Sequence, residues 1–348
     1  MRALYSSHES ALHIVYQEIE RYAISQREVF VGTPGSLTKR KNAAGYAFYT
    51  RQYYDGADKK REAYLAGPVG DPAADEKAAR LKLRIAEAAG IVASVRLLGR
   101  NGYALADART QATLAALHNV RLFDAGAVLV GAHAFGVLLN KLGVRAAQYA
   151  TEDVDIARGG TLALPKLGRE LIAVLEDSGI EFVEVPGLPS TKPPTSYKEK
   201  GKSRFHVDLL VPARGGTFPI VPVPEVGAHA QGLPYLDYLL DEAQRAALLA
   251  REGVAAVRVP TAERFALHKL LVSQLRRGRD ARSDRDLQQA AVLLAVLADK
   301  HPGAIEEAAA GLRRSAYRRV RHAFDALRTH LPESCERAWQ TLDALPVR

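Results

Sequence analysis

The chain has 348 residues, 47% of them hydrophobic, and a formal net charge of +9 at pH 7. This length is sufficient for two or three domains with sizeable cores, and the positive charge favours anionic partners such as nucleotides or nucleic acid. The single cysteine, Cys335, excludes an intramolecular disulfide, and no apolar run reaches the length of a membrane span. Residues 1–30 also show no signal-peptide pattern, so we expect a cytoplasmic protein without a membrane partner.

The N-terminal third is expected to combine helices with a β-hairpin. Apolar residues at helical spacing predict a helix within residues 8–30. Aromatic-rich segments at Gly45–Tyr54 and Lys59–Leu65 flank the turn signal Asp55–Gly56, which predicts the hairpin. The next predicted helices are Asp71–Ala89 and Ala104–His118.

Basic residues surround the hairpin and allow two interpretations. Aromatic and basic side chains interleaved on a hairpin can stack on bases and hold phosphates. The same tyrosines can equally pack a small sheet onto the following helix. The basic residues concerned are Lys39, Arg40, Lys41, Arg51, Lys59, Lys60 and Arg61.

The most informative stretch begins with a short apolar run, Ala127–Val130, followed directly by a glycine. The run predicts a buried strand, Gly131 predicts a turn, and the residues up to Gly143 predict a helix. A glycine that opens a helix lets the backbone approach a phosphate closely, and the helix N-terminus presents N–H groups to it. His133 has two interpretations, either a hydrogen-bond donor to that phosphate or an ordinary half-buried histidine.

A second strand is predicted shortly afterwards, and it carries Asp153 and Asp155. Side chains two residues apart on a strand point to the same face, so these two carboxylates project together. Adjacent carboxylates repel each other unless a cation lies between them. The pattern therefore predicts a metal site next to a phosphate site, whereas the alternative is a pair of solvated acids at a strand end.

A third aspartate, Asp208, lies in the apolar segment Phe205–Val211. It projects from the face opposite the valines of this segment, on the same side as His206. A buried strand seldom carries an aspartate unless the carboxylate is paired or binds a cation. The polar segment before it, Ser196–Arg204, is predicted to be a turn, and the strand of Asp208 is expected to neighbour the strand of Asp153.

Gly131, the Asp153–Asp155 strand and Asp208 together resemble the core of the nucleotidyltransferase superfamily, the polymerase-beta-like fold. The resemblance covers Asp124–Val211. Gly-x-His-Ala-Phe followed by Asp-x-Asp is similar to a little-characterised bacterial branch related to abortive-infection-type nucleotidyltransferases. The sequence departs from the pattern at Ala132, where many members have serine or glycine, so a hydroxyl that would touch a phosphate is missing.

The resemblance also implies a role for each of these residues. Asp153, Asp155 and Asp208 would be catalytic and would bind Mg²⁺ or Mn²⁺. The nucleotide, an NTP that serves as substrate, would bind at Gly131, Ala132, His133, Lys269 and Asp286. From the residues alone, Lys269 is equally an exposed helix lysine, and Asp286 is equally an acid that complements a helix dipole.

The remaining chain is expected to end in helices. Proline restricts Pro219–Pro224 to an edge strand or a loop, and Val254–Val259 reads as the last strand. Within the following region, Arg314, Arg318 and Arg321 share one helix face, which either contacts a nucleic-acid backbone or is simply solvated. The predicted helices are Ala262–Gln274, Asp284–Ala298, Ala304–His330 and Glu333–Leu345.

The sequence thus predicts an α/β (α+β) fold with a polymerase-beta-like nucleotidyltransferase core. We expect N-terminal helices with a basic, aromatic hairpin over residues 1–120, the core over residues 121–260, and a C-terminal helical bundle over residues 261–348. By resemblance, the function is Mg²⁺-dependent transfer of a nucleoside monophosphate to an acceptor hydroxyl on RNA or tRNA, a protein or a small molecule. The alternative is a catalytically idle member that binds nucleic acid or a protein partner.

Overall fold

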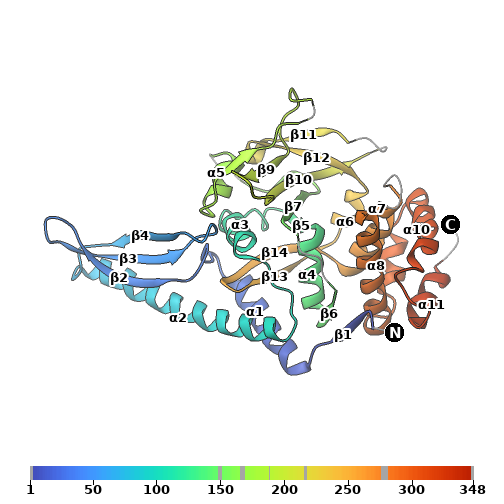
Figure 1. Cartoon of the computed structure of the whole chain (residues 1–348), viewed down its shortest axis with the longest axis horizontal. Helices are drawn as coiled ribbons and strands as arrows, with labels where there is room; N and C mark the ends of the chain where they lie inside the picture. The colour runs from blue at the N-terminus through green and yellow to red at the C-terminus, as the bar shows by residue number, and fades with distance from the viewer. Residues whose placement is uncertain are drawn as a thin grey trace.

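The computed structural model describes residues 3–147, 151–164, 169–187, 189–214, 218–275 and 281–345. Its N-terminal part contains the predicted hairpin, to which a third antiparallel strand is added in the order β2-β3-β4. We call this three-stranded sheet the arm, and Figure 1 shows it projecting from one side of the molecule with helix α2 running along it. The elements are β1 (Tyr5–Ser7), α1 (Ser10–Ser25), β2 (Ser36–Lys41), β3 (Ala47–Tyr54), β4 (Lys60–Ala66) and α2 (Pro72–Arg100).

Helix α2 begins where the sequence specifies a start. The carboxylate of Asp71 accepts a hydrogen bond from the backbone N–H of Ala74, and Pro72 occupies the first turn. The helix continues beyond the predicted end to Arg100 because Val92, Val95 and Leu98 remain buried against the body of the protein.

The central part of the chain folds into a mixed seven-stranded sheet with flanking helices. Five strands follow the order β11-β12-β10-β7-β5, and β9 joins β10 and β8. Strand β10 is parallel to β7 and β12, whereas β5 is antiparallel to β7. The elements are α3 (Ala108–Asn119), β5 (Ala127–Val130), α4 (Gly131–Lys141), β6 (Val144–Ala146), β7 (Asp153–Arg158), α5 (Leu171–Glu176), β8 (Phe182–Glu184), β9 (Ser196–Glu199), β10 (His206–Ala213), β11 (Ile220–Val223), β12 (Ala228–Pro234) and α6 (Leu236–Leu240).

The predicted turn at Ser196–Arg204 is wrong, because its first half is strand β9. Tyr197 is only 2% exposed, and β9 pairs with β8 on one side and β10 on the other. A buried tyrosine and two neighbouring strands therefore outweigh the polar composition of the segment. The prediction for Pro219–Pro224 is confirmed, since β11 is the edge strand of the sheet.

A two-stranded antiparallel sheet, β13 (Ala243–Ala250) and β14 (Gly253–Pro260), connects this part to the C-terminal helices. The predicted helix Ala304–His330 is wrong as a single element, because the chain breaks around Gly311 and begins a new helix at Arg314. The C-terminal helices are α7 (Ala262–Ser273), α8 (Ala281–Lys300), α9 (Ala304–Ala310), α10 (Arg314–Leu327) and α11 (Glu336–Ala344).

One hydrophobic core runs from the central sheet into the C-terminal helices, and a second cluster joins α1, α2 and the β13–β14 hairpin. This mixture of helices and largely separate sheets confirms the predicted α+β class. Among the described residues, no helix has both the length and the apolar character that a membrane crossing needs.

Candidate active site

The turn between β5 and α4 strongly favours glycine. Gly131 has a φ of +69°, and a Cβ built on it would lie 2.0 Å from Oδ2 of Asp155. Both observations exclude a larger residue without a local rearrangement. The N-cap residue before it is Val130, whose side chain has no hydrogen-bonding group. The first N–H groups of α4 therefore depend on another partner, and an anion is a suitable one.

The aspartates on β7 and β10 are aligned by the strand register. Asp155 pairs with Asp208 and Asp153 pairs with His206 across these parallel strands. Partner residues on neighbouring strands lie about 5 Å apart and project from the same face. The expectation that the strands of Asp153 and Asp208 are neighbours is therefore confirmed.

The environment of Asp155 disfavours its charge. Burial, followed by the negative charge of Asp208, raises the pKa of Asp155 to about 6, and the charge of Lys269 acts in the opposite direction. A cation bound between the two carboxylates would relieve this repulsion.

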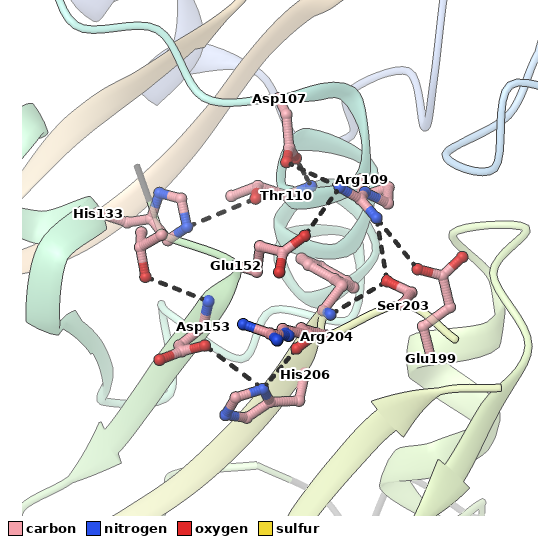
Figure 2. Close-up of polar contacts among 12 residues, drawn as sticks. Asp107, Arg109, Thr110, His133, Glu152, Asp153, Glu199, Ser203, Arg204 and His206 are labelled. Atoms are coloured by element: carbon pink, nitrogen blue, oxygen red, sulfur yellow. Dashed lines mark hydrogen bonds and ion pairs between the residues drawn. The ribbon is translucent and has the colours of Figure 1, made fainter. Parts of the chain in front are cut away.

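His206 lies between two of the aspartates, as Figure 2 shows for its contact with Asp153. Its Nδ1 is 3.4 Å from Oδ1 of Asp153, and its Nε2 is 3.5 Å from Oδ2 of Asp208. The hydrogen bond with Asp208 raises the pKa of His206 to about 9, which favours the protonated ring between the two carboxylates. The strand alternation predicts His206 on this face, but it suggests no role for the ring. Its position two residues before Asp208 was the available signal.

A cavity of about 630 Å³ lies over these residues. The sheet and the start of α4 form one wall, and helices α7 and α8 form the other. Seven of the eight predicted site residues line this cavity: Gly131, Ala132, Asp153, Asp155, Asp208, Lys269 and Asp286.

The helical wall carries most of the positive charge. Nζ of Lys269 lies 2.7 Å from Oδ1 of Asp286, and both side chains are largely buried. Arg282, Arg285 and Gln289 also line the cavity. These three were not predicted from the sequence, although they share one face of α8 with Asp286 at helical spacing.

His133 is placed apart from the other predicted residues. In the part of the chain that the structure describes, His133 does not line the large cavity. It lines a neighbouring cavity of about 200 Å³ instead. Its Nε2 is 3.5 Å from the hydroxyl of Thr110, and burial lowers the pKa of its ring. The two cavities share Ala132 and Thr151 in their linings.

Arg109 fixes the beginnings of the strands that carry the aspartates (Figure 2). From α3, its guanidinium reaches Glu152 at 3.6 Å, next to Asp153, and Glu199 on β9 at 3.3 Å. It also donates a hydrogen bond to the hydroxyl of Ser203 at 3.1 Å. This one cation therefore ties three segments together at the edge of the site.

The donor set is suitable for a divalent cation of the Mg²⁺ type, which prefers carboxylate oxygens. The raised pKa of Asp155 beside Asp208 fits such an ion as well. Among the described residues, however, no three His, Cys, Asp or Glu side chains converge closely enough to hold a metal as they stand. Asp153 is the most exposed of the three aspartates, at 53% of its side chain, and its partner is His206.

Comparison with protein families gives one match, to a family described as nucleotidyltransferase, over residues 108–312. The matched range includes every predicted site residue. Comparisons with curated proteins and with solved structures gave no match.

Proposed function

This chain belongs to the nucleotidyltransferase family, and from that premise we propose that it transfers a nucleoside monophosphate from an NTP to an acceptor hydroxyl. The observation that carries the proposal is the alignment of Asp155 with Asp208, directly beside the glycine that opens α4. The residues to which we assign phosphate binding and cation binding line one cavity, which supports the proposal. The same motifs support a place in the bacterial branch related to abortive-infection-type nucleotidyltransferases, and the single cysteine supports a cytoplasmic location.

Each residue would have a separate role in the reaction. The N–H groups at the start of α4, approached through Gly131, would bind the outer phosphates of the NTP. Lys269 would stabilise the negative charge that builds on the leaving pyrophosphate. A bond would form between the acceptor oxygen and the α-phosphorus, the bond from the α-phosphorus to the bridging oxygen would break, and Asp208 would accept the hydroxyl proton.

Asp153, Asp155 and Asp208 would hold Mg²⁺ or Mn²⁺. When bound, such an ion supplies Lewis-acid stabilisation of charge on the phosphate oxygens. His206 would contribute by holding Asp153 and Asp208 in place in the absence of the ion, since it contacts both carboxylates.

Radiolabelled NTPs test this reaction. The protein is incubated with each α-labelled or γ-labelled NTP, Mg²⁺ or Mn²⁺, and separate pools of RNA, protein and small metabolites. The mechanism requires that the α label be transferred and that the γ label leave with pyrophosphate. Transfer of the γ label would instead show a kinase, and the roles given to the aspartates would then be wrong.

The alternative is an idle member of the family. If NTP with Mg²⁺ raises the melting temperature of the protein, the nucleotide binds the native state. An Asp153→Asn/Asp155→Asn variant that stays folded should lose this increase. No increase with any NTP, together with no label transfer, would favour the idle alternative.

A further inference from the structure

Two hairpins that are far apart in the sequence meet beside the candidate active site. The β3–β4 turn is anchored to the body by a hydrogen bond from the N–H of Gly56 to the carbonyl of Ser178, at 2.8 Å. The β9–β10 hairpin is anchored next to it, where Nζ of Lys200 lies 3.1 Å from Glu181. The hydrogen bond with Lys200, helped by the charges of Lys200, Lys59 and Arg61, lowers the pKa of Glu181, so cations of both hairpins act on this one carboxylate. The free end of the arm points away from this junction (Figure 1).

The junction has an excess of positive charge. Three of its carboxylates have cationic partners: Glu181 pairs with Lys200, Asp55 with Arg61 and Glu199 with Arg109, which also contacts Glu152 and Asp107. Five more cations belong to the two hairpins, and among the described residues none of them forms an ion pair. They outnumber the four remaining carboxylates nearby, which are Asp58 and Glu184 together with the Glu152 and Asp107 that share Arg109. We call these five the basic tract: Lys59, Lys60, Lys198, Lys202 and Arg204.

The basic tract leads to the catalytic aspartates through the strand register. Lys198 on β9 is the partner of His206 on β10, and His206 is the partner of Asp153 on β7. Neighbouring strands lie about 4.8 Å apart, so Lys198 and Asp153 are separated by roughly 10 Å on the same sheet face. Arg204 stands two residues before His206, and its backbone carbonyl oxygen accepts a hydrogen bond from the ring of His206 (Figure 2).

The arm adds aromatic rings at the other end of the basic tract. Tyr54 is 49% exposed and is the strand partner of Lys60. Further along the arm, Tyr64 is 67% exposed and its ring lies 5.8 Å from that of Phe48. Exposed rings beside cations suit a polymer that carries both phosphates and flat bases. An acidic peptide would use the cations but not the rings.

We propose that the basic tract binds a single-stranded nucleic acid and directs its terminal hydroxyl to Asp208. The inference rests on the proposed function for the chemistry, and it names the acceptor class that the site itself leaves open. The basic stripe on α10 is not part of this surface. Its member Arg321 contacts the backbone carbonyls of Leu342 and Leu345, which is a structural role within the C-terminal helices.

The first experiment measures binding alone, by fluorescence anisotropy with labelled RNA and DNA oligonucleotides of about 12 nucleotides. The Lys59→Glu/Lys198→Glu/Lys202→Glu variant should bind at least tenfold more weakly at low salt. Its plot of log affinity against log salt concentration should be less steep by about 2, because three phosphate contacts are lost. The proposal is supported if the wild type binds RNA or DNA more tightly than this variant does. The difference between the wild type's affinities for RNA and DNA identifies the preferred sugar.

The matched control is Arg314→Glu/Arg318→Glu/Arg319→Glu, which makes the same change of charge at exposed positions of α10. It should bind like the wild type. An equal loss in this control would overturn the proposal, because net charge would then explain binding. Equal competition by polyglutamate, or no binding by the wild type, would overturn it too. A Tyr54→Ala/Tyr64→Ala variant should lose affinity at all salt concentrations, and an unchanged affinity would count against bases on the arm.

The melting temperature with nucleotide distinguishes a failure of this inference from a failure of the proposed function. The triple lysine variant should keep the full increase in melting temperature with NTP and Mg²⁺, since the basic tract lies outside the nucleotide cavity. If this variant binds nucleotide normally but no longer transfers it to the oligonucleotide, the result would support the role of the basic tract in binding the acceptor. Nucleic-acid binding that depends on the tract, without any transfer of label, would refute the proposed reaction but not this surface.

Discussion

The ammonium group of Lys269 and the carboxylate of Asp286 lie 2.7 Å apart, joining α7 to α8 at the cavity wall that faces the aspartates of the sheet. With 14% and 5% of their side chains exposed, the two charges are largely removed from water. The pair can therefore serve the fold, the nucleotide or both, and the two roles respond differently to substitution.

Either single substitution breaks this largely buried ion pair. Lys269→Met or Asp286→Asn alone should lower the free energy of unfolding by about 3–5 kcal/mol. The double variant Lys269→Met/Asp286→Leu should recover most of that loss but still show no stabilisation by NTP and Mg²⁺. Urea unfolding with and without nucleotide measures both effects. A stable double variant that binds nucleotide normally would assign the pair to the fold alone.

Gly131→Ala should damage the site because the added Cβ would meet the carboxylate of Asp155. The control is Gly126→Ala, where φ is also positive at +114° but a Cβ would have nothing within 4 Å. Backbone strain should lower the free energy of unfolding of both variants by about 1–3 kcal/mol. Only Gly131→Ala should also lose the nucleotide-dependent increase in melting temperature. Equal nucleotide binding by the two variants would contradict a phosphate site at this turn.

Asp155→Asn should stabilise the protein in the absence of ligands. The substitution removes a charge that burial and Asp208 disfavour, so the free energy of unfolding at pH 7 should rise by about 1–3 kcal/mol. The same variant should lose the stabilisation by NTP and Mg²⁺. Asp153→Asn is the comparison, because Asp153 is half exposed and its loss should change the unfolding free energy little. A destabilised Asp155→Asn protein would show that this carboxylate supports the fold rather than a cation.

His268 should make the protein sensitive to mild acid. Burial, followed by the charge of Lys269, lowers the pKa of His268 from 6.5 to about 3 in the folded state. Between pH 6.5 and pH 3, His268 is therefore protonated in the unfolded chain but neutral in the folded chain. The free energy of unfolding decreases as the pH drops through this range, by up to about 1.4 kcal/mol per pH unit. Urea unfolding at pH 7 and pH 5 should show a smaller decrease for His268→Gln than for the wild type. Equal decreases would place the acid sensitivity elsewhere.

Local patterns in the sequence were sufficient to predict much of the site. An apolar run ending in glycine predicted β5 and the start of α4, and alternation predicted the strands of Asp153, Asp155 and Asp208. These predictions succeeded because a strand or helix face is decided by neighbours within a few residues. The predicted roles of these residues stay predictions, as do the domain boundaries at residues 120 and 260.

Other features depended on contacts between distant segments. Strand β9 lies in a polar segment and forms because Tyr197 is buried between β8 and β10. His206 became a partner of two aspartates only through the register of β7 and β10. In the same way, Lys269 and Asp286 were predicted separately, and the packing of α7 on α8 made them an ion pair.

The sequence by itself therefore identified seven of the side chains and backbone positions that line the cavity, including the glycine at its turn. The tertiary structure decided which of those side chains meet, because strand register and helix packing are set by burial of the whole core. It also brought the β3–β4 and β9–β10 hairpins together around Glu181, although more than one hundred residues separate them in the chain. No local sequence pattern predicts that these hairpins meet. Attraction between exposed charges is too weak to bring them together, so their positions depend on the buried core.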